Sequence, residues 1–249
     1  MQQEEILVKS TLDGSLEPSL LYRAEGKRPL LVGLHTWSFD RFNQINNMLP
    51  WAEKCNFHLL LPQFRGSNLQ SNPRHREACG SLLAKQDIID AIDYHVAEGI
   101  ADPENIFLLG SSGGGHMALL MAGYRPEYFK AIGAFVPITD LRKWAEENKH
   151  YAPHVLACCG NSEEEMLLRS PCHYAENILK ANVKIFHGKF DPVVPVSHSI
   201  NLYAQLMAIN PAARVFLDIF DGGHQLDMPQ AMHWLLSQYQ KDALVQVTG

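Results

Sequence analysis

The sequence predicts an α/β protein with a mostly parallel, doubly wound sheet and an antiparallel hairpin at its N-terminus. Short, continuously apolar runs, typical of strands covered on both faces, alternate with stretches of helical periodicity. Before them, two β-rich runs flank the pair Asp13-Gly14, which is typical of a hairpin turn. In sheets of this kind the active site lies at the carboxyl ends of the strands. Candidate functional residues are therefore expected in the loops that follow strands.

The composition limits the classes of protein to which the chain can belong. Its 249 residues fit one domain, residues 1–249, and a net charge of −6 lacks the excess of cations that a nucleic-acid partner requires. No apolar run approaches the roughly 20 residues that span a membrane. The N-terminal residues are acidic where a secretory signal needs cations, and the five cysteines have no regular spacing. We expect a cytoplasmic protein without nucleic-acid or membrane partners, and the oligomeric state stays open.

After the hairpin, the first half of the chain alternates between strands and helices. Ser81 can cap a helix whose apolar residues recur at helical spacing, and Gly99 can end that helix. The expected strands are residues 4–10, 16–23, 30–34, 57–61 and 106–110, and the expected helices are residues 43–55, 81–99 and 114–125.

The second half continues the alternation around one interruption. Residues 138–176 are polar and show no regular period, so we expect an irregular, cap-like insertion there. Within it, the acidic run Glu163-Glu164-Glu165 fits the solvated start of a helix. The expected strands are residues 130–136, 183–187 and 214–220, and the expected helices are residues 197–208 and 227–239.

A GxSxG motif follows the strand that ends at Leu109. The segment Gly110-Ser111-Ser112-Gly113-Gly114 lies directly between a strand and a helix, which is the setting this motif needs. Small residues flank the central position because larger side chains would strike the neighbouring strand or helix. Ser112 would stand at a helix N-terminus, where N–H groups favour developing negative charge. This context predicts a nucleophilic serine, and the alternative is a glycine-rich turn without chemistry.

A serine nucleophile needs a base and an acid that orients the base. Asp191 follows the strand at 183–187 and His224 follows the strand at 214–220, so both lie at carboxyl ends of strands. The chain order Ser112, Asp191, His224 is the order found in α/β hydrolases. We therefore expect these three residues to be nucleophile, acid and base. Weaker candidates are His116 and His187 for the base, both of which we expect to pack in the core or to neighbour the catalytic residues, and Asp218, Asp221 and Asp227 for the acid.

An oxyanion hole requires two main-chain donors. One should be the N–H of Gly113, the residue after the proposed nucleophile, and the other should come from the loop after the strand at 30–34. We expect Trp37 to be the second donor, with Thr36 as the alternative. Trp37, Phe39 and Trp144 are expected to contact substrate, although packing under the insertion is an equal alternative for Trp37 and Phe39.

Neither a metal nor an organic cofactor is expected. The chain has no CxxC, HExxH, P-loop or GxGxxG pattern in a suitable place, so nothing predicts a zinc or nucleotide site. The candidate zinc ligands have the wrong spacing and fit an ordinary insertion better; they are His150, His154, Cys158, Cys159, Cys172 and His173.

Together these features resemble the α/β hydrolases, and more specifically the catalytic domain of the prolyl oligopeptidase family. The resemblance covers nearly the whole chain and is more specific than GxSxG alone. It implies hydrolysis of an acyl bond, with Ser112, Asp191 and His224 as nucleophile, acid and base. The segments that carry it are FRGS (64–67), GSSGGG (110–115), PITDLRKW (137–144), SPCHYAENI (170–178), HGKFDPVVP (187–195) and GGH (222–224).

Departures from the family pattern suggest which bond is cleaved. Family peptidases usually carry an additional N-terminal β-propeller, whereas this chain has a short hairpin before the hydrolase core. Similar stand-alone domains are frequently esterases. The expected function is therefore hydrolysis of a small or carbohydrate-linked carboxylic ester. The first alternative is a prolyl oligopeptidase-type peptidase that acts on short peptides, and the second is a non-catalytic binding protein with the hydrolase fold.

Overall fold

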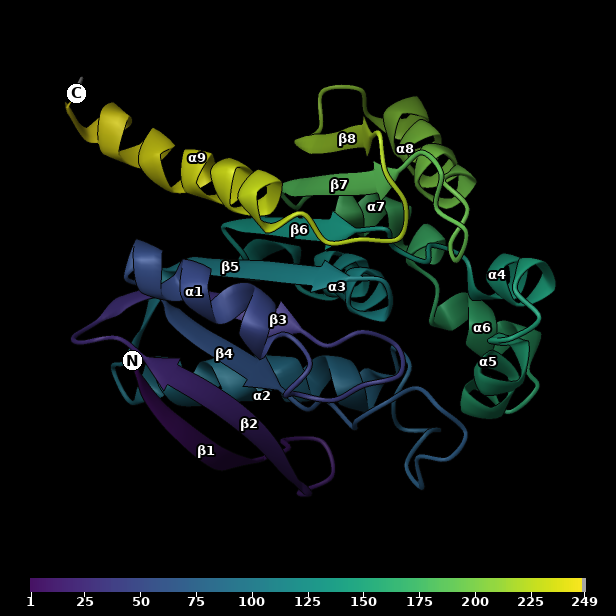
Figure 1. Cartoon of the computed structure of the whole chain (residues 1–249), viewed down its shortest axis with the longest axis horizontal. Coiled ribbons are helices and arrows are strands. Elements are labelled where there is room, and N and C mark those ends of the chain that lie inside the picture. The colour runs from purple at the N-terminus through teal and green to yellow at the C-terminus, as the bar shows by residue number, and fades with distance from the viewer. Residues whose placement is uncertain (248–249) are drawn as a thin grey trace.

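An eight-stranded sheet forms the centre of the protein (Figure 1). The computed structural model describes the backbone of residues 1–247 and the side chains of residues 1–239. Strands β1 and β2 pair antiparallel, β2 pairs antiparallel with β4, and the remaining neighbours are parallel. The predicted α/β fold with a mostly parallel sheet and an N-terminal hairpin is confirmed. In spatial order the strands are β1 (Gln2–Lys9), β2 (Leu16–Arg23), β4 (His58–Pro62), β3 (Arg28–Leu34), β5 (Ala101–Ser111), β6 (Ala131–Phe135), β7 (Val183–Gly188) and β8 (Val215–Phe220).

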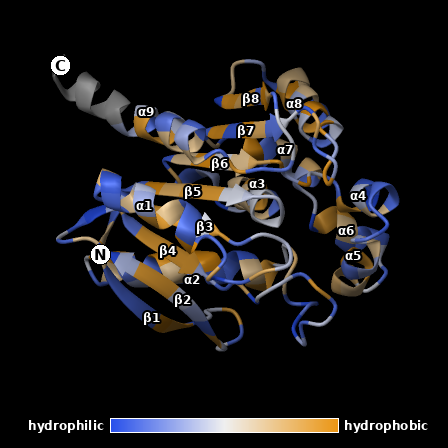
Figure 2. Cartoon of the chain, in the orientation of Figure 1, coloured by the Kyte–Doolittle hydropathy of each residue, from blue (hydrophilic) through white to orange (hydrophobic). Residues whose placement is uncertain are grey.

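Helices cover both faces of the sheet, as continuously apolar strands require. Along β3, Leu30 and Val32 pack with α2, α3, α7 and α8, whereas Leu31 between them packs with α1 and α9. In Figure 2 the ribbons of the central strands β4 and β5 are largely orange, whereas the helices around the sheet carry both blue and orange segments. No described helix is both long and apolar enough to cross a bilayer. These helices are α1 (Ile45–Cys55), α2 (Leu82–Ala97), α3 (Gly113–Tyr124), α7 (Ala175–Ile178), α8 (Ser197–Ile209) and α9 (Met228–Val247).

The ends of α2 follow the signals read from the sequence. Ser81 is the N-cap, and its side-chain oxygen accepts a hydrogen bond from the N–H of Ala84 at 3.1 Å. Gly99 follows the C-cap with a φ of +69°, a conformation that glycine adopts without strain. The predicted start and end of this helix are confirmed.

The insertion between β6 and β7 is helical, so the expectation of an irregular stretch at 138–176 is wrong. Its helices are at most eight residues long, and so short a helix shows no readable apolar period. The sequence did predict the start of one of these helices, because α6 begins at Glu163, the first residue of the acidic run. In Figure 1 these helices lie on the right, beyond the carboxyl ends of the strands. They are α4 (Leu141–Glu147), α5 (Ala152–Cys159) and α6 (Glu163–Leu168), followed by a short 3-10 turn at Pro171–Tyr174; a second 3-10 turn, Pro126–Tyr128, lies between α3 and β6.

Candidate active site

Ser112 stands on a sharp turn between β5 and α3. Its φ of 57° and ψ of −119° are rare for a residue with a side chain. Two main-chain hydrogen bonds hold the turn: the N–H of Ser112 donates to the carbonyl of Phe135 at 2.9 Å, and the N–H of His116 donates to the carbonyl of Ser112 at 2.8 Å. The elements on both sides therefore fix the strained residue in place.

Glycines make this turn possible because backbone lies where side chains would be. A Cβ on Gly110 would strike the carbonyl of Gly114. A Cβ on Gly114 would lie 2.6 Å from the carbonyl oxygen of Leu34, and one on Gly113 would lie 2.5 Å from the nitrogen of Trp37. The loops after β3 and β5 are thus in direct main-chain contact.

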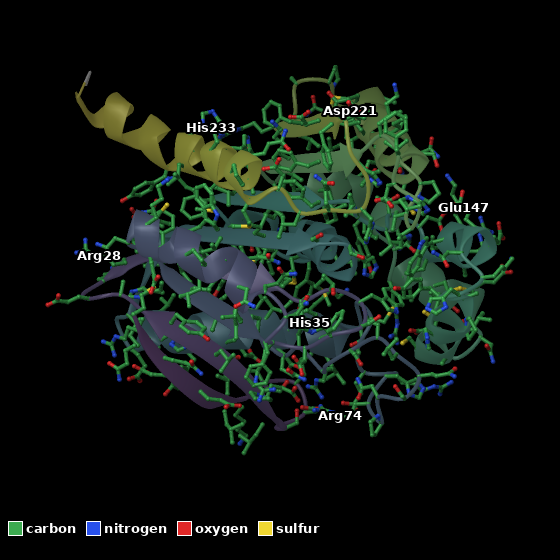
Figure 3. The ribbon with its side chains drawn as sticks, viewed as in Figure 1. Arg28, His35, Arg74, Glu147, Asp221 and His233 are labelled. Atoms are coloured by element: carbon green, nitrogen blue, oxygen red, sulfur yellow. The ribbon has the colours of Figure 1, made fainter. Side chains whose placement is uncertain are left out.

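The loop after β3 offers a main-chain donor beside Ser112. Within the described residues, the N–H of Trp37 has no protein acceptor, whereas the N–H of Thr36 donates to Oδ1 of Asn43 at 3.1 Å. The carbonyl of Trp37 accepts from the N–H of Asn68 at 2.8 Å, which fixes the peptide. Figure 3 shows His35, the first residue of this loop, near the middle of the view. Of the two expected donors, Trp37 is the one whose N–H is free.

Asp191 and His224 form a close pair on the loops after β7 and β8. Nδ1 of His224 donates to Oδ2 of Asp191 at 2.8 Å, which leaves Nε2 as the basic nitrogen. Oδ1 of Asp191 accepts from the N–H groups of Val193 and Val194 at 2.8 and 2.9 Å. Burial alone would raise the pKa of Asp191, but hydrogen bonds from His187 and His224 outweigh it and hold that pKa well below its usual range. The carboxylate is therefore ionised at neutral pH.

His187 supports Asp191 from the end of β7 and is fully buried. Nε2 lies 2.8 Å from the carbonyl oxygen of Val194 and 3.5 Å from Oδ2 of Asp191, so it carries the proton. Nδ1 then accepts from the hydroxyl of Ser199 at 2.7 Å. The sequence predicted His187 to be a packing residue or a neighbour of the site rather than the base, and in the structure it lies beside Asp191. The His187-Gly188 pair at the end of this strand is the sequence feature that could have predicted this histidine beside Asp191.

The remaining candidates for the base and the acid have partners elsewhere in the fold. His116 is buried in α3, and Nε2 donates to the carbonyl of Arg169 at 2.7 Å, while burial lowers its pKa to about 4. Asp218 pairs with Lys184 at 3.1 Å, and Oδ1 of Asp227 accepts from the first turn of α9. Asp221 lies on the surface at the end of β8 (Figure 3). Among these residues and the described remainder, no group of three or more His, Cys, Asp or Glu side chains could hold a metal ion.

The expected substrate contacts differ in their exposure. The Trp144 side chain is fully buried and its indole donates to the carbonyl of Val193 at 3.0 Å, so the expectation that Trp144 contacts substrate is corrected. The Trp37 indole is also buried, packed edge-on against Trp144 with ring centroids 4.8 Å apart. Its side chain is therefore part of the core, and only its main chain faces the site. Phe39 is 58% exposed and lines a cavity of about 490 Å³ beside this loop.

A buried ion network under that cavity was missed at the sequence level. The Arg65 side chain is fully buried and pairs with Asp13 at 2.7 Å, Glu77 at 2.9 Å and Asp87 at 2.5 Å. Burial opposes the charge of Arg65, but these hydrogen bonds raise its pKa above the usual value. Arg74, which lies at the lower edge of the molecule in Figure 3, shares Glu77 with it. The segment FRGS contains this arginine, but nothing in the sequence shows its distant partners.

The parallel sheet, the serine on a glycine-walled turn after β5, and the Asp–His pair on later loops define an α/β hydrolase. Within that class, residues 43–241 match the prolyl oligopeptidase family. The chain therefore belongs to the prolyl oligopeptidase family, a family of serine hydrolases, and the resemblance read from the sequence is confirmed.

Several known proteins are similar to the chain. The rat acylamino-acid-releasing enzyme is 27% identical over 66% of this chain and 24% of its own length. The structure of a puromycin-hydrolysing peptidase from Mycobacterium tuberculosis has a TM-score of 0.78 and 18% identity, covering 96% of this chain and 39% of that one. The structure of an acylaminoacyl peptidase from Pyrococcus horikoshii has a TM-score of 0.69 and 20% identity, and the match covers 90% of this chain and 37% of that one. The chain thus spans about a quarter of the length of the curated relatives it matches.

These comparisons correct the expected reaction. Carboxylic ester hydrolysis was preferred because the chain shows only a hairpin before the hydrolase core. The family match and the relatives point to peptidases instead, so the ester interpretation is wrong and the peptidase interpretation is supported. The inference failed because the architecture that precedes the core carries no information about which acyl bond the core cleaves.

Proposed function

We propose that the protein is a serine peptidase of the prolyl oligopeptidase type that cleaves short peptides. In this proposal Ser112 is the nucleophile, His224 the base and Asp191 the acid that orients the base. The hydrogen bond of 2.8 Å from Nδ1 of His224 to Asp191 carries the argument, because it fixes the tautomer in which Nε2 can take a proton. The strained turn at Ser112, at the carboxyl end of β5 in the same sheet, supports the same assignment.

The reaction proceeds by two acyl transfers. The hydroxyl of Ser112 attacks the peptide carbonyl while Nε2 of His224 takes its proton, and the buried Asp191 carboxylate stabilises the imidazolium. His224 then gives the proton to the leaving amine, which departs and leaves an acyl-serine. Water attacks this ester, with His224 again taking and returning the proton, so the peptide acid is released and Ser112 is restored.

Two main-chain N–H groups would stabilise the oxyanion. Gly113 is the first residue of α3, so its N–H has no carbonyl partner within the helix. The N–H of Trp37 comes from a loop that touches Gly113. Donors held in this way cost little reorganisation when charge develops on the carbonyl oxygen.

Three further features belong to this proposal. The cavity lined by Ser38 and Phe39 adjoins the Trp37 peptide and would take part of the peptide substrate. The chain would be one domain in which the insertion 138–176 caps the site, since its helices lie beyond the carboxyl ends of the strands. The five free cysteines support action in the cytoplasm.

The test is hydrolysis of peptide anilides by the wild type, Ser112→Ala and the matched control Ser111→Ala. Substrates with acylated and with free N-termini distinguish the activity named for the rat relative from that of an aminopeptidase. Loss of the nucleophile should lower turnover about a million-fold, whereas Ser111→Ala should stay within a few-fold of wild type. Anilide cleavage that survives in Ser112→Ala would contradict the assignment.

A further inference from the structure

Lys85 is a buried cation without a counterion. It lies in the first turns of α2 and is 6% exposed, between the rings of Tyr124 and Tyr174, whose centroids are 5.3 and 5.2 Å from Nζ. Among the described residues, Nζ makes no hydrogen bond and no ion pair. An ammonium group taken out of water without an acceptor is costly. Burial, with repulsion from Arg169, accordingly lowers the pKa of Lys85 to about 8.

Lys85 lines a cavity of about 400 Å³ together with residues at the start of α2 and in the insertion. Arg169 also lines it, and its guanidinium donates to Glu165 at 2.9 Å and to the carbonyl of Ala78 at 3.0 Å. Glu165 therefore neutralises the charge of Arg169, and the charge of Lys85 has no counterion among the described residues.

The N-terminal end of α2 forms another part of the cavity. Leu82, its first residue, lines the cavity, and the N–H groups of Leu82 and Leu83 have no carbonyl partner in the helix. The side-chain oxygen of Ser81 accepts from the N–H of Ala84 and its carbonyl accepts from the N–H of Lys85, so neither reaches the N–H groups of Leu82 and Leu83. Exposed N–H groups at a helix start favour a negative charge, so they add to the attraction of the unpaired ammonium.

We propose that this cavity binds the anionic group, a phosphate or a carboxylate, of a small organic molecule. The ammonium of Lys85 supplies the counter-charge and the first N–H groups of α2 supply hydrogen-bond donors. The cavity is larger than a single phosphate, and Tyr174 and Leu168 give the body of the molecule an apolar wall. The site shares no residue with the proposed catalytic machinery.

Titration calorimetry with inorganic phosphate and with acetate tests the proposal and separates the two anion classes. We expect one of the two to bind the wild type, and Lys85→Met to weaken that binding at least about tenfold, the loss typical of a charged hydrogen bond. Lys27→Met removes the same charge from an exposed lysine between β2 and β3 and should bind like the wild type. Equal binding by Lys85→Met and wild type would overturn the proposal, as would no binding of either anion.

Sulfate gives a second readout because its charge is constant between about pH 6.5 and pH 9. The groups around Nζ are Tyr124, Tyr174, His116 and the Arg169–Glu165 pair. Burial lowers the pKa of His116 to about 4 and raises the pKa of both tyrosines, so none of these three groups changes charge in the range in which Lys85 does. Sulfate affinity should fall as the pH rises through about 8 in the wild type and stay flat in Lys85→Met. A flat wild-type profile would contradict the role of Lys85.

Discussion

The proposed nucleophile and the proposed acid–base pair are held in place by different means. Ser112 is positioned by backbone against backbone, since Gly110, Gly113 and Gly114 each approach a main-chain atom too closely for a side chain. Asp191 and His224 are positioned by hydrogen bonds among side chains and loop N–H groups. One half of the site is thus fixed by main-chain packing and main-chain hydrogen bonds, and the other by hydrogen bonds of side chains. Substitutions of these glycines should therefore damage the fold, and substitutions of Asp191 or His224 should damage the proposed chemistry.

Within the acid–base half of the site, Asp191→Asn should have the largest effect, which is on turnover. If the amide oxygen keeps the N–H groups of Val193 and Val194, the amide NH₂ faces Nδ1 of His224 and forces the proton onto Nε2. The imidazole could then no longer accept the proton of Ser112. Turnover should fall about 10⁴-fold, measured on the substrate that the wild type cleaves. Loss of turnover with an unchanged melting temperature would support the view that this half of the site serves the chemistry and not the fold. Near-normal turnover would contradict it.

The next effect is that of Gly110→Ala on stability. The new Cβ would meet the carbonyl of Gly114 in the first turn of α3, and neither segment can move freely. Overpacking of this kind should lower the free energy of unfolding by about 3 kcal/mol. Gly133→Ala is the matched control, because its close contact would be with the end of the Leu109 side chain at 2.9 Å, whereas the nearest main-chain atom, the carbonyl oxygen of Leu108, would lie 4.0 Å away. Similar denaturation midpoints in urea for the two variants would contradict backbone packing as the cause.

A smaller effect is expected from loosening the acid. His187→Leu removes the N–H shared by Val194 and Asp191, so the carboxylate can shift away from His224. A misplacement of this order should lower kcat roughly ten- to a hundredfold, with KM little changed. His187→Gln restores a donor and should recover part of the loss. If His187→Leu and His187→Gln have the same kcat and the same pH profile of kcat, His187 has only a packing role.

The smallest effect is on the pH dependence of stability. Because the pKa of Asp191 is lowered in the folded state, its ionised form contributes stability above the unfolded pKa of about 3.9, and this contribution is lost as the pH falls. The free energy of unfolding should therefore decrease more steeply between about pH 5 and pH 3 in the wild type than in Asp191→Asn. Parallel curves from urea titrations would show that Asp191 is not stabilised in its charged form.

The features that the sequence revealed are those encoded locally. The apolar runs, the N-cap Ser81 and Gly99 predicted their elements because each acts within a few residues of its own position. The helices at 138–176 escaped because they are short and draw their stability from an apolar cluster that includes Trp37 and Trp144, which lie far apart in the chain.

The same distinction applies to the site. A glycine-flanked serine after a strand can be read directly, since the backbone geometry requires those glycines. The burial of Trp144 and the pairing of Arg65 with Asp13 depend on contacts between residues far apart in the chain, which no local pattern encodes. The cleaved bond could not be read either, because the catalytic residues are shared by esterases and peptidases.

The two halves of the site also differ in when they are made. Ser112, Gly113 and Trp37 belong to strands, a helix and a loop that are complete once β6 leaves the ribosome, whereas Asp191 and His224 follow β7 and β8. Domains generally fold as units during synthesis. A growing chain carries the proposed nucleophile and the proposed oxyanion donors but lacks the proposed base until β8 has been made. On this assignment, activity would appear only after the loop with His224 has emerged, and a shorter nascent chain would lack it.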